Sequence, residues 1–174
     1  MTTYRIRALD QEIADEVRRT RRAPDYGHPA HVEVATGTGP CRLCLRPFEV
    51  GAEERLLFTL NPFPEGATPS PGPVFVHPGS CPRYETDGFP KDLAGLPLLL
   101  EGYDAGGMAL VRRMVTQDPA GDVELVFASA GVSYAHVRNA KAGCFIARVE
   151  RVQTGAAAIG LGSAASRPAA GART

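Results

Sequence analysis

Cys41-Arg-Leu-Cys44 and His77-Pro-Gly-Ser-Cys81 are the two stretches that decide how this chain folds. They contain three of its four cysteines and one of its four histidines. Structural zinc takes four ligands, drawn from cysteine thiolates and histidine nitrogens, at the corners of a tetrahedron. Two residues between Cys41 and Cys44 let one tight turn offer both sulfurs to one ion, and Pro-Gly-Ser suits a second turn. The spacing therefore predicts a structural zinc site of the Cys3His type made by Cys41, Cys44, His77 and Cys81.

All four positions of such a site are filled by side chains, so the metal is expected to stabilise the fold. Catalytic zinc instead keeps one position open for water. Two alternatives remain for the same residues. One is a redox dithiol at Cys41 and Cys44, although Pro47 and the glycine-rich approach differ from the strand and long helix that flank such motifs. The other is a group of unligated cysteines that only pack.

The sequence between the two pairs predicts a hairpin. Residues 55–60 read as a strand, and residues 74–77 form a short apolar strand that runs into the second pair. Five prolines between residues 61 and 73 require an extended loop between them. This order of knuckle, hairpin and second pair resembles a treble-clef-like zinc finger, in which the second pair lies at the start of a helix. Here the second pair has three intervening residues, where such fingers often have two, and Pro82 makes any helix short or late.

The chain before Cys41 predicts a strand, a helix and a loop. Residues 4–9 alternate between apolar and polar side chains, and Asp10 is a suitable cap for a helix with Ile13, Ala14 and Val17 on one face. Four arginines between residues 18 and 22 end that helix. We interpret them as a solvated helix end whose positive charge suits the helix dipole, and a phosphate-binding patch is the alternative. Residues 32–34 are a candidate edge strand.

The sequence after Cys81 predicts two hairpins and a helix. Gly106-Gly107 predicts a turn between strands at 97–103 and 108–116. Asp118-Pro119 predicts the start of a helix that ends near Gly131. The sequence therefore predicts one α+β domain over residues 1–151, built from short, mostly antiparallel strands with two or three helices and an embedded zinc-knuckle-like loop pair. Residues 152–174 are rich in Ala, Gly and Ser and are expected to be disordered.

The last hairpin, with strands at 134–138 and 144–150, offers a second candidate site. Tyr134, His136 and Arg138 share one face of a strand, and Arg148 can join them from the partner strand. A histidine with two arginines suits a small anion such as phosphate or a carboxylate. This gives the candidate ligand-binding residues His136, Arg138, Asn139 and Arg148. The alternative is an ordinary solvated sheet face, and Cys144 is expected to pack beside Ile146.

Composition narrows the possible partners. The chain has 174 residues, with 19 basic and 19 acidic side chains and a formal net charge of zero. A nucleic-acid-binding protein usually carries a basic surplus, so this balance argues against that class. No apolar run approaches the length of a membrane span, and the first residues do not read as a signal peptide. We therefore expect a cytoplasmic protein whose partner is a small ligand or another protein.

Several segments together carry a resemblance to the bacterial family known as domain of unknown function 1203, over roughly residues 4–151. The resemblance implies a small bacterial cytosolic protein and implies no activity. The segments that carry it are Tyr4-Arg-Ile-Arg-Ala-Leu9, Cys41-Arg-Leu-Cys-Leu45, Gly72-Pro-Val-Phe-Val-His77, Cys81-Pro-Arg-Tyr84, His136-Val-Arg-Asn-Ala140 and Gly143-Cys-Phe-Ile-Ala-Arg-Val149.

Two functions follow as hypotheses. The first is a zinc-stabilised binding domain without catalytic activity. The second is an enzyme that acts on a small anionic substrate, with His136 as acid or base, Arg138 and Arg148 as the anion clamp, and Cys144 or Asn139 nearby.

Overall fold

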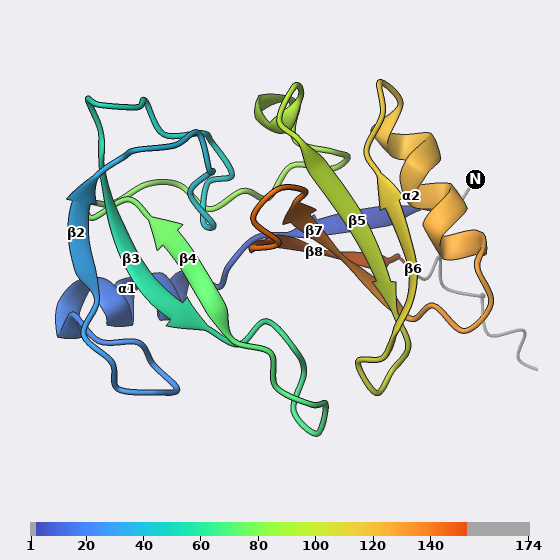
Figure 1. Cartoon of the computed structure of the whole chain (residues 1–174), viewed down its shortest axis with the longest axis horizontal. Coiled ribbons are helices and arrows are strands. Elements are labelled where there is room, and N and C mark those ends of the chain that lie inside the picture. The colour runs from blue at the N-terminus through green and yellow to red at the C-terminus, as the bar shows by residue number, and fades with distance from the viewer. Residues whose placement is uncertain (1–2, 153–174) are drawn as a thin grey trace, which may run out of the picture.

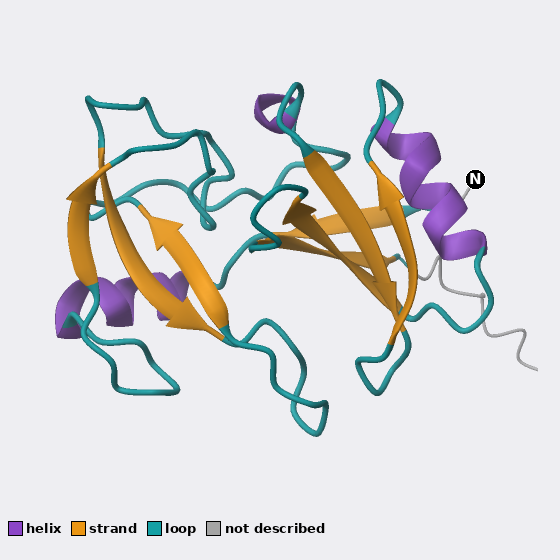
Figure 2. Ribbon diagram, viewed as in Figure 1, coloured by secondary structure: helices purple, strands orange, loops and turns teal. Residues whose placement is uncertain are grey.

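The computed structural model describes residues 3–152 and shows two antiparallel sheets with two α-helices (Figures 1 and 2). The predicted α+β class is therefore confirmed, and the number of α-helices among the described residues is two. Almost all of the tail that the sequence predicts to be disordered lies outside the described residues. The elements are β1 (Tyr4–Arg7), α1 (Gln11–Thr20), β2 (His31–Val34), β3 (Glu54–Leu60), β4 (Gly72–Val76), a 3-10 turn (Lys91–Leu93), β5 (Leu98–Tyr103), β6 (Ala109–Met114), α2 (Pro119–Ala128), β7 (Tyr134–Asn139) and β8 (Phe145–Arg151).

The larger sheet has five strands in the order β1-β8-β7-β5-β6, and every neighbouring pair is antiparallel. The predicted β5–β6 hairpin is present, with Gly107 in the left-handed region at φ 86°. Helix α2 packs on β5 and β6. Gly102 allows this close approach, because a Cβ atom there would lie 2.9 Å from a methyl group of Val126.

The smaller sheet has three strands in the order β2-β3-β4, and α1 lies beside it at the other end of the molecule (Figure 1). Its β3–β4 hairpin is joined by the proline-rich loop that the sequence predicts. Asn61 holds the two ends of this loop, because its side-chain oxygen accepts hydrogen bonds from the backbone N–H groups of Phe63 and Ser70.

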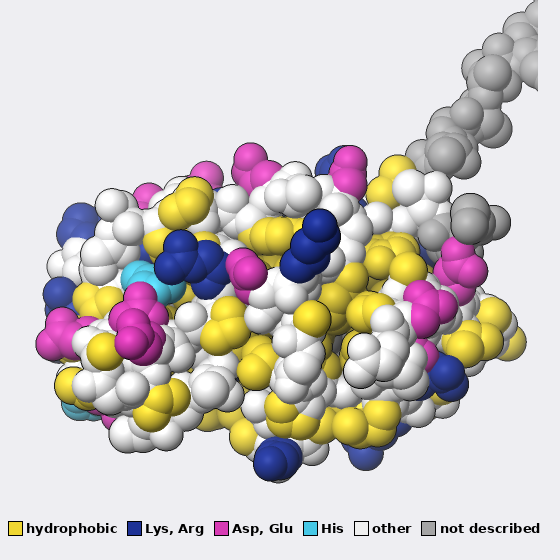
Figure 3. Space-filling model, turned by 90° about the horizontal axis from the view of Figure 1, so that it is seen from above, with side chains coloured by type: hydrophobic (Ala, Val, Ile, Leu, Met, Phe, Trp, Pro, Cys, Tyr) yellow, Lys and Arg dark blue, Asp and Glu magenta, His cyan; other side chains and the backbone are white. Residues whose placement is uncertain are grey.

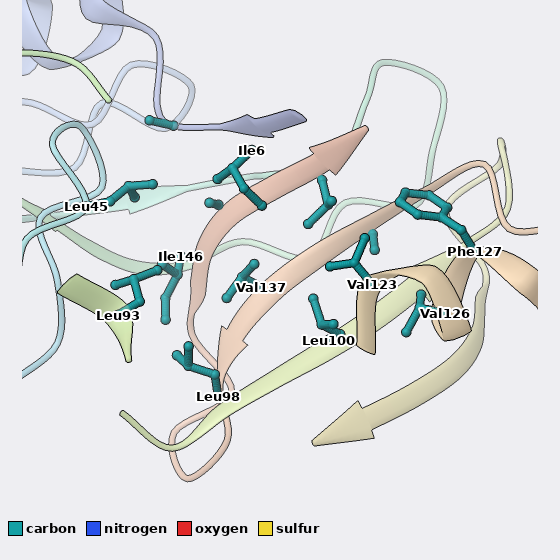
Figure 4. Packing of buried hydrophobic residues seen from close by; sticks show 14 of the residues in the cluster. Ile6, Leu45, Leu93, Leu98, Leu100, Val123, Val126, Phe127, Val137 and Ile146 are labelled. Carbon is teal, nitrogen blue, oxygen red and sulfur yellow. The ribbon is translucent and has the colours of Figure 1, made fainter. Parts of the chain in front are cut away.

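Each sheet has its own hydrophobic cluster. The first lies between the five-stranded sheet and α2 and includes Leu100, Val126 and Val137 (Figure 4). The second lies between the three-stranded sheet and α1 and includes Val17, Leu56 and Val76. Burial of this apolar surface is the main favourable term in folding. The residues that connect the two clusters therefore contribute to the stability of the whole fold.

The surface seen from above mixes basic, acidic and hydrophobic side chains, in keeping with the net charge of zero (Figure 3). No helix within residues 3–152 has the length and apolar character needed to cross a membrane.

Candidate metal centre

The first ligand pair lies in a tight turn between β2 and β3. The backbone N–H of Cys41 donates to the carbonyl of Arg46, and the N–H of Leu45 donates to the carbonyl of Cys41. Leu45 has φ 59°, a left-handed conformation that is uncommon for a residue with a branched side chain. Its side chain is completely buried, so core packing holds this conformation. The turn directs both Cys41 and Cys44 inward.

The β3–β4 hairpin returns the chain to this turn and delivers the second pair. The Sγ atoms of Cys41 and Cys81 are 3.8 Å apart, and the Sγ atom of Cys44 lies 3.6 Å from Nδ1 of His77. A tetrahedral zinc with bonds of about 2.3 Å to sulfur and about 2.0 Å to nitrogen requires edges of about 3.5–3.8 Å. All four ligand atoms lie within 4.8 Å of one another. Cys41, Cys44, His77 and Cys81 are therefore close enough to bind one metal ion.

The helix that a treble-clef-like finger places after its second pair is absent. From Cys81 to the 3-10 turn at Lys91 the chain forms no helix. Pro82 explains the difference, because proline disfavours the helical conformation of the residue before it. The knuckle, the hairpin and the second pair are present in the expected order.

Two further residues complete the site, and sequence reasoning missed both. Arg18 donates from Nη2 to Sγ of Cys81 over 3.4 Å and from Nε to the carbonyl of His77. Its side chain is only 11% exposed, so the interpretation of Arg18 as part of a solvated helix end is wrong. A carboxylate oxygen of Glu53 lies 3.6 Å from Nε2 of His77. An acidic partner on the second histidine nitrogen is typical of metal sites and leaves Nδ1 to face the metal.

The three thiols influence one another's ionisation through mutual hydrogen bonds. The pKa of Cys41 is lowered because its thiolate accepts hydrogen bonds from Cys44 and Cys81. The pKa values of Cys44 and Cys81 are raised because each thiol donates a hydrogen bond to Cys41, which favours the protonated thiol. A metal ion held by these residues would remove this competition, since the positive charge of a metal favours deprotonated thiol ligands.

The turn that holds Cys41 and Cys44 also connects the two halves of the molecule. The carbonyl of Arg42 accepts from the N–H of Leu9, and the N–H of Arg42 donates to the carbonyl of Phe75. Leu43 belongs to the hydrophobic cluster of the small sheet, whereas Leu45 reaches the cluster of the large sheet (Figure 4). A ligand turn thus lies where both cores meet.

The buried side chain of Arg42 extends this connection to the large sheet. Its guanidinium donates to the carbonyls of Phe145 and Pro40. The Arg42 side chain is 1% exposed, and burial lowers its pKa to about 10. Backbone carbonyls satisfy the donors that burial takes from water, which is the condition for keeping such a charge inside.

The second candidate site lies on one face of the large sheet. Cross-strand pairing brings five charged or titratable residues from five strands into one row, and this row consists of Arg7, Arg148, His136, Glu101 and Arg112. The predicted alignment of His136 with Arg148 is therefore confirmed by the strand register.

His136 is completely buried at the centre of this row. Its ring centroid lies about 5 Å from those of Phe63, Tyr103, Tyr134 and Phe145, so four aromatic rings enclose it. Burial, with the positive charges of Arg138 and Arg148, lowers the pKa of His136 to about 3. The imidazole is therefore neutral near pH 7. Its Nε2 has no hydrogen-bond partner among the described residues.

Arg138 is held by internal partners. Its Nε lies 2.9 Å from a carboxylate oxygen of Glu101 and donates to the hydroxyl of Tyr103, and its Nη1 donates to the carbonyl of Gly143. The side chains of Arg138 and Glu101 are 13% and 7% exposed. The alternative of a solvated sheet face is therefore wrong, because Phe63 of the proline-rich loop and Phe145 cover this part of the face.

The other predicted ligand-binding residues have separate partners. Asn139 accepts from the N–H groups of Lys141 and Ala142 and so shapes the β7–β8 turn. Arg148 stacks on the ring of Tyr134 and pairs with Glu150 at 2.9 Å. Cys144 is partly buried, with its Sγ 3.8 Å from the carbonyl of Ala142. That His136, Arg138, Asn139 and Arg148 bind an anion stays a prediction.

The low pKa of His136 predicts a specific loss of stability in mild acid. The unfolded chain binds this proton near pH 6.5, whereas the folded chain binds it only near pH 3. The unfolded state therefore holds more protons between these values, and stability falls as pH falls. Between pH 7 and pH 5, wild type should lose about 2 kcal/mol more than His136→Phe. Urea unfolding at both pH values, with equal zinc present, measures the difference, and equal losses would contradict it.

Comparison with known protein families finds a match between residues 38–151 and the family described as "Protein of unknown function (DUF1203)". The matched segment contains all four candidate metal ligands and the whole β7–β8 hairpin. No curated protein and no solved structure was found to be similar to the chain. Because the match spans well over half of the sequence, the chain belongs to the DUF1203 family.

Proposed function

We propose that this protein is a binding domain stabilised by one structural zinc ion and without catalytic activity at the metal. The observation that carries the proposal is the place of the Cys3His cluster. Its ligand turn is hydrogen-bonded to Phe75 of the small sheet and, through the side chain of Arg42, to Phe145 of the large sheet, and its side chains enter both hydrophobic cores. A metal at this point stabilises both halves together.

Zinc is the metal that this donor set favours. Three sulfurs and one imidazole nitrogen in a tetrahedral arrangement suit zinc better than magnesium or calcium, which prefer oxygen ligands. Four protein ligands leave no position for water, which argues for a structural role. Arg18 supports the same role, because its positive charge offsets the excess negative charge of three thiolates around a divalent ion.

Metal analysis tests this proposal directly. Protein purified without added metal is expected to contain about one zinc per chain. Replacement of zinc by cobalt should give the intense absorption of tetrahedral cobalt with thiolate ligands, which reports on ligand type and geometry. Cys144→Ser is the matched control, because Cys144 lies outside the cluster and its variant should keep the full metal content. Metal-free protein that is folded and has four reactive thiols would overturn the proposal.

The alternative function, an enzyme that acts on a small anion at the β7–β8 hairpin, has one observation in its favour. Nε2 of buried His136 and the hydroxyl of buried Tyr134 have no hydrogen-bond partners among residues 3–152. Buried polar groups without partners are rare in folded proteins, and a ligand is one way to satisfy them. Inorganic phosphate should then raise the melting temperature of wild type but not of Arg148→Gln. The pairing of Arg138 with Glu101 weighs against this reading, because it neutralises the expected anion clamp.

A further inference from the structure

One pocket lies at the edge of the first hydrophobic core, and none of the candidate metal ligands lines it. Its volume is about 870 Å³, and its walls are the loop around the 3-10 turn and the segment that joins β6 to α2. Ligand sites in proteins commonly measure about 300–1,000 Å³. Figure 3 shows the molecule from above, with hydrophobic side chains exposed beside basic ones.

The floor of this pocket is apolar. Four of its side chains, Tyr4, Phe89, Leu96 and Val115, are the partly buried residues at the margin of the first core. The fully packed core residues Leu93 and Leu98 lie behind them. An apolar group that enters the pocket would therefore extend the core of the large sheet and gain stability by removing this surface from water.

Both lysines of the chain line this one pocket. The sequence contains 17 arginines but only two lysines, Lys91 and Lys141. They come from different elements, the 3-10 turn and the β7–β8 turn, and only the tertiary fold brings them together. Neither ammonium group forms a salt bridge or a hydrogen bond with any of the described residues. Two positive charges without an ion-pair partner among the described residues thus stand at the border of a pocket with apolar walls.

The pocket also has one acidic residue, whose carboxylate forms no ion pair with either lysine. Asp118 is the N-cap of α2, and its side chain accepts a hydrogen bond from the N–H of Gly121. Its carboxylate is therefore committed to the helix start, where negative charge is stabilising.

From these observations we propose that the pocket binds a small organic carboxylate with an apolar body, independently of the zinc site. The apolar body lies on Phe89, Leu96 and Val115, and the carboxylate lies between Lys91 and Lys141. A neutral analogue would lose the ion pairs, and a cationic analogue would be repelled. The ligand of the proposed binding domain is then a small organic anion and not another protein.

The two lysines give a direct experiment on the full chain. Reductive methylation with ¹³C-formaldehyde keeps their charge and yields one NMR signal for each lysine. Decanoate, added below its micelle concentration, should shift both signals and saturate them. Decyltrimethylammonium, with the same chain length and opposite charge, should shift neither. Decanoate that leaves both lysine signals unmoved would overturn the proposal.

Substitution of the two lysines separates the contribution of charge to decanoate binding from the contribution of apolar contact. Lys91→Gln with Lys141→Gln should weaken decanoate binding by up to about tenfold by calorimetry, since the two substitutions remove two exposed ion pairs. Binding of decanol should change less than about twofold. The matched control is Arg5→Gln with Arg19→Gln, which removes two exposed charges outside the pocket and should leave decanoate affinity unchanged. Equal weakening in both double variants would contradict the proposal.

A second copy of the chain is the competing occupant. In that case the lysine signals would shift on dilution of the protein alone, and decanoate would dissociate the copies. Lysine signals that depend on protein concentration in the absence of decanoate would therefore also overturn the small-carboxylate proposal. Failure of either experiment leaves the zinc content of the protein unaffected, so this inference and the proposed metal site fail separately.

Discussion

Cys41→Ser is expected to lose the metal and most of the stability of the fold together. Serine cannot supply the thiolate, and the remaining donors form an incomplete tetrahedron. Apparent binding free energies of structural zinc are about 10–16 kcal/mol near pH 7, whereas a whole domain is stable by only about 5–15 kcal/mol. Loss of most of this binding energy should therefore leave the chain largely unfolded near room temperature. Circular dichroism, with zinc content measured on the same sample, tests the expectation.

The position of the ligand turn predicts how far this unfolding extends. Because Leu43 and Leu45 enter different hydrophobic clusters, both sheets should lose protection when the metal is removed. Hydrogen exchange should show increased rates in β5 and β7 as well as in β3 and β4 after chelation. Cys144→Ser should resemble wild type in every measurement. Protection that persists in β5 and β7 would show that the large sheet folds without the metal.

Glu101→Ala is expected to be the most destabilising change away from the metal site. The carboxylate of Glu101 accepts from Tyr103 and pairs with Arg112 and Arg138. Burial by itself raises the pKa of Glu101, but these hydrogen bonds and positive charges outweigh burial and hold the pKa below its usual value. Its removal leaves Arg138 as a buried charge without its counter-ion, a change that costs about 3–5 kcal/mol in other proteins.

Glu150→Ala is the matched control for this prediction. Glu150 also pairs with two arginines, Arg7 and Arg148, but its side chain is 37% exposed. Ion pairs of this kind are worth about 0–1 kcal/mol, so the variant should stay close to wild type in urea unfolding. Similar losses in the two variants would contradict the buried-network interpretation.

The lowered pKa of Glu101 adds a pH test. The unfolded carboxyl titrates near its ordinary value of about 4.5, and the folded one titrates below it. The stabilisation is therefore complete above the unfolded value and is lost as pH falls through the folded value. The difference in stability between wild type and Glu101→Ala should shrink only below about pH 4.5.

Most strands and both helices could be predicted because their signals are local. The alternation in residues 4–9 gives β1, and Gly106-Gly107 gives the β5–β6 turn. The spacing of Cys41 and Cys44 is likewise a property of a few bonded residues, so it predicts a ligand turn without knowledge of the fold. Local reasoning also indicated that Pro82 makes any helix after Cys81 short or late, and the chain forms none before the 3-10 turn at Lys91.

The spacing of cysteine and histidine in the sequence is enough to identify the side chains that can bind a metal, whereas the surroundings of these side chains follow from tertiary contacts. Arg18 lies 63 residues from Cys81 in the sequence, and no local pattern connects a helix-end arginine with a thiolate. The burial of His136 depends on Phe63, which a loop of the other sheet carries over it. Lys91 and Lys141 line one pocket for the same reason. Charge and burial depend on contacts between distant segments, whereas a ligand turn depends only on the covalent geometry of its own residues.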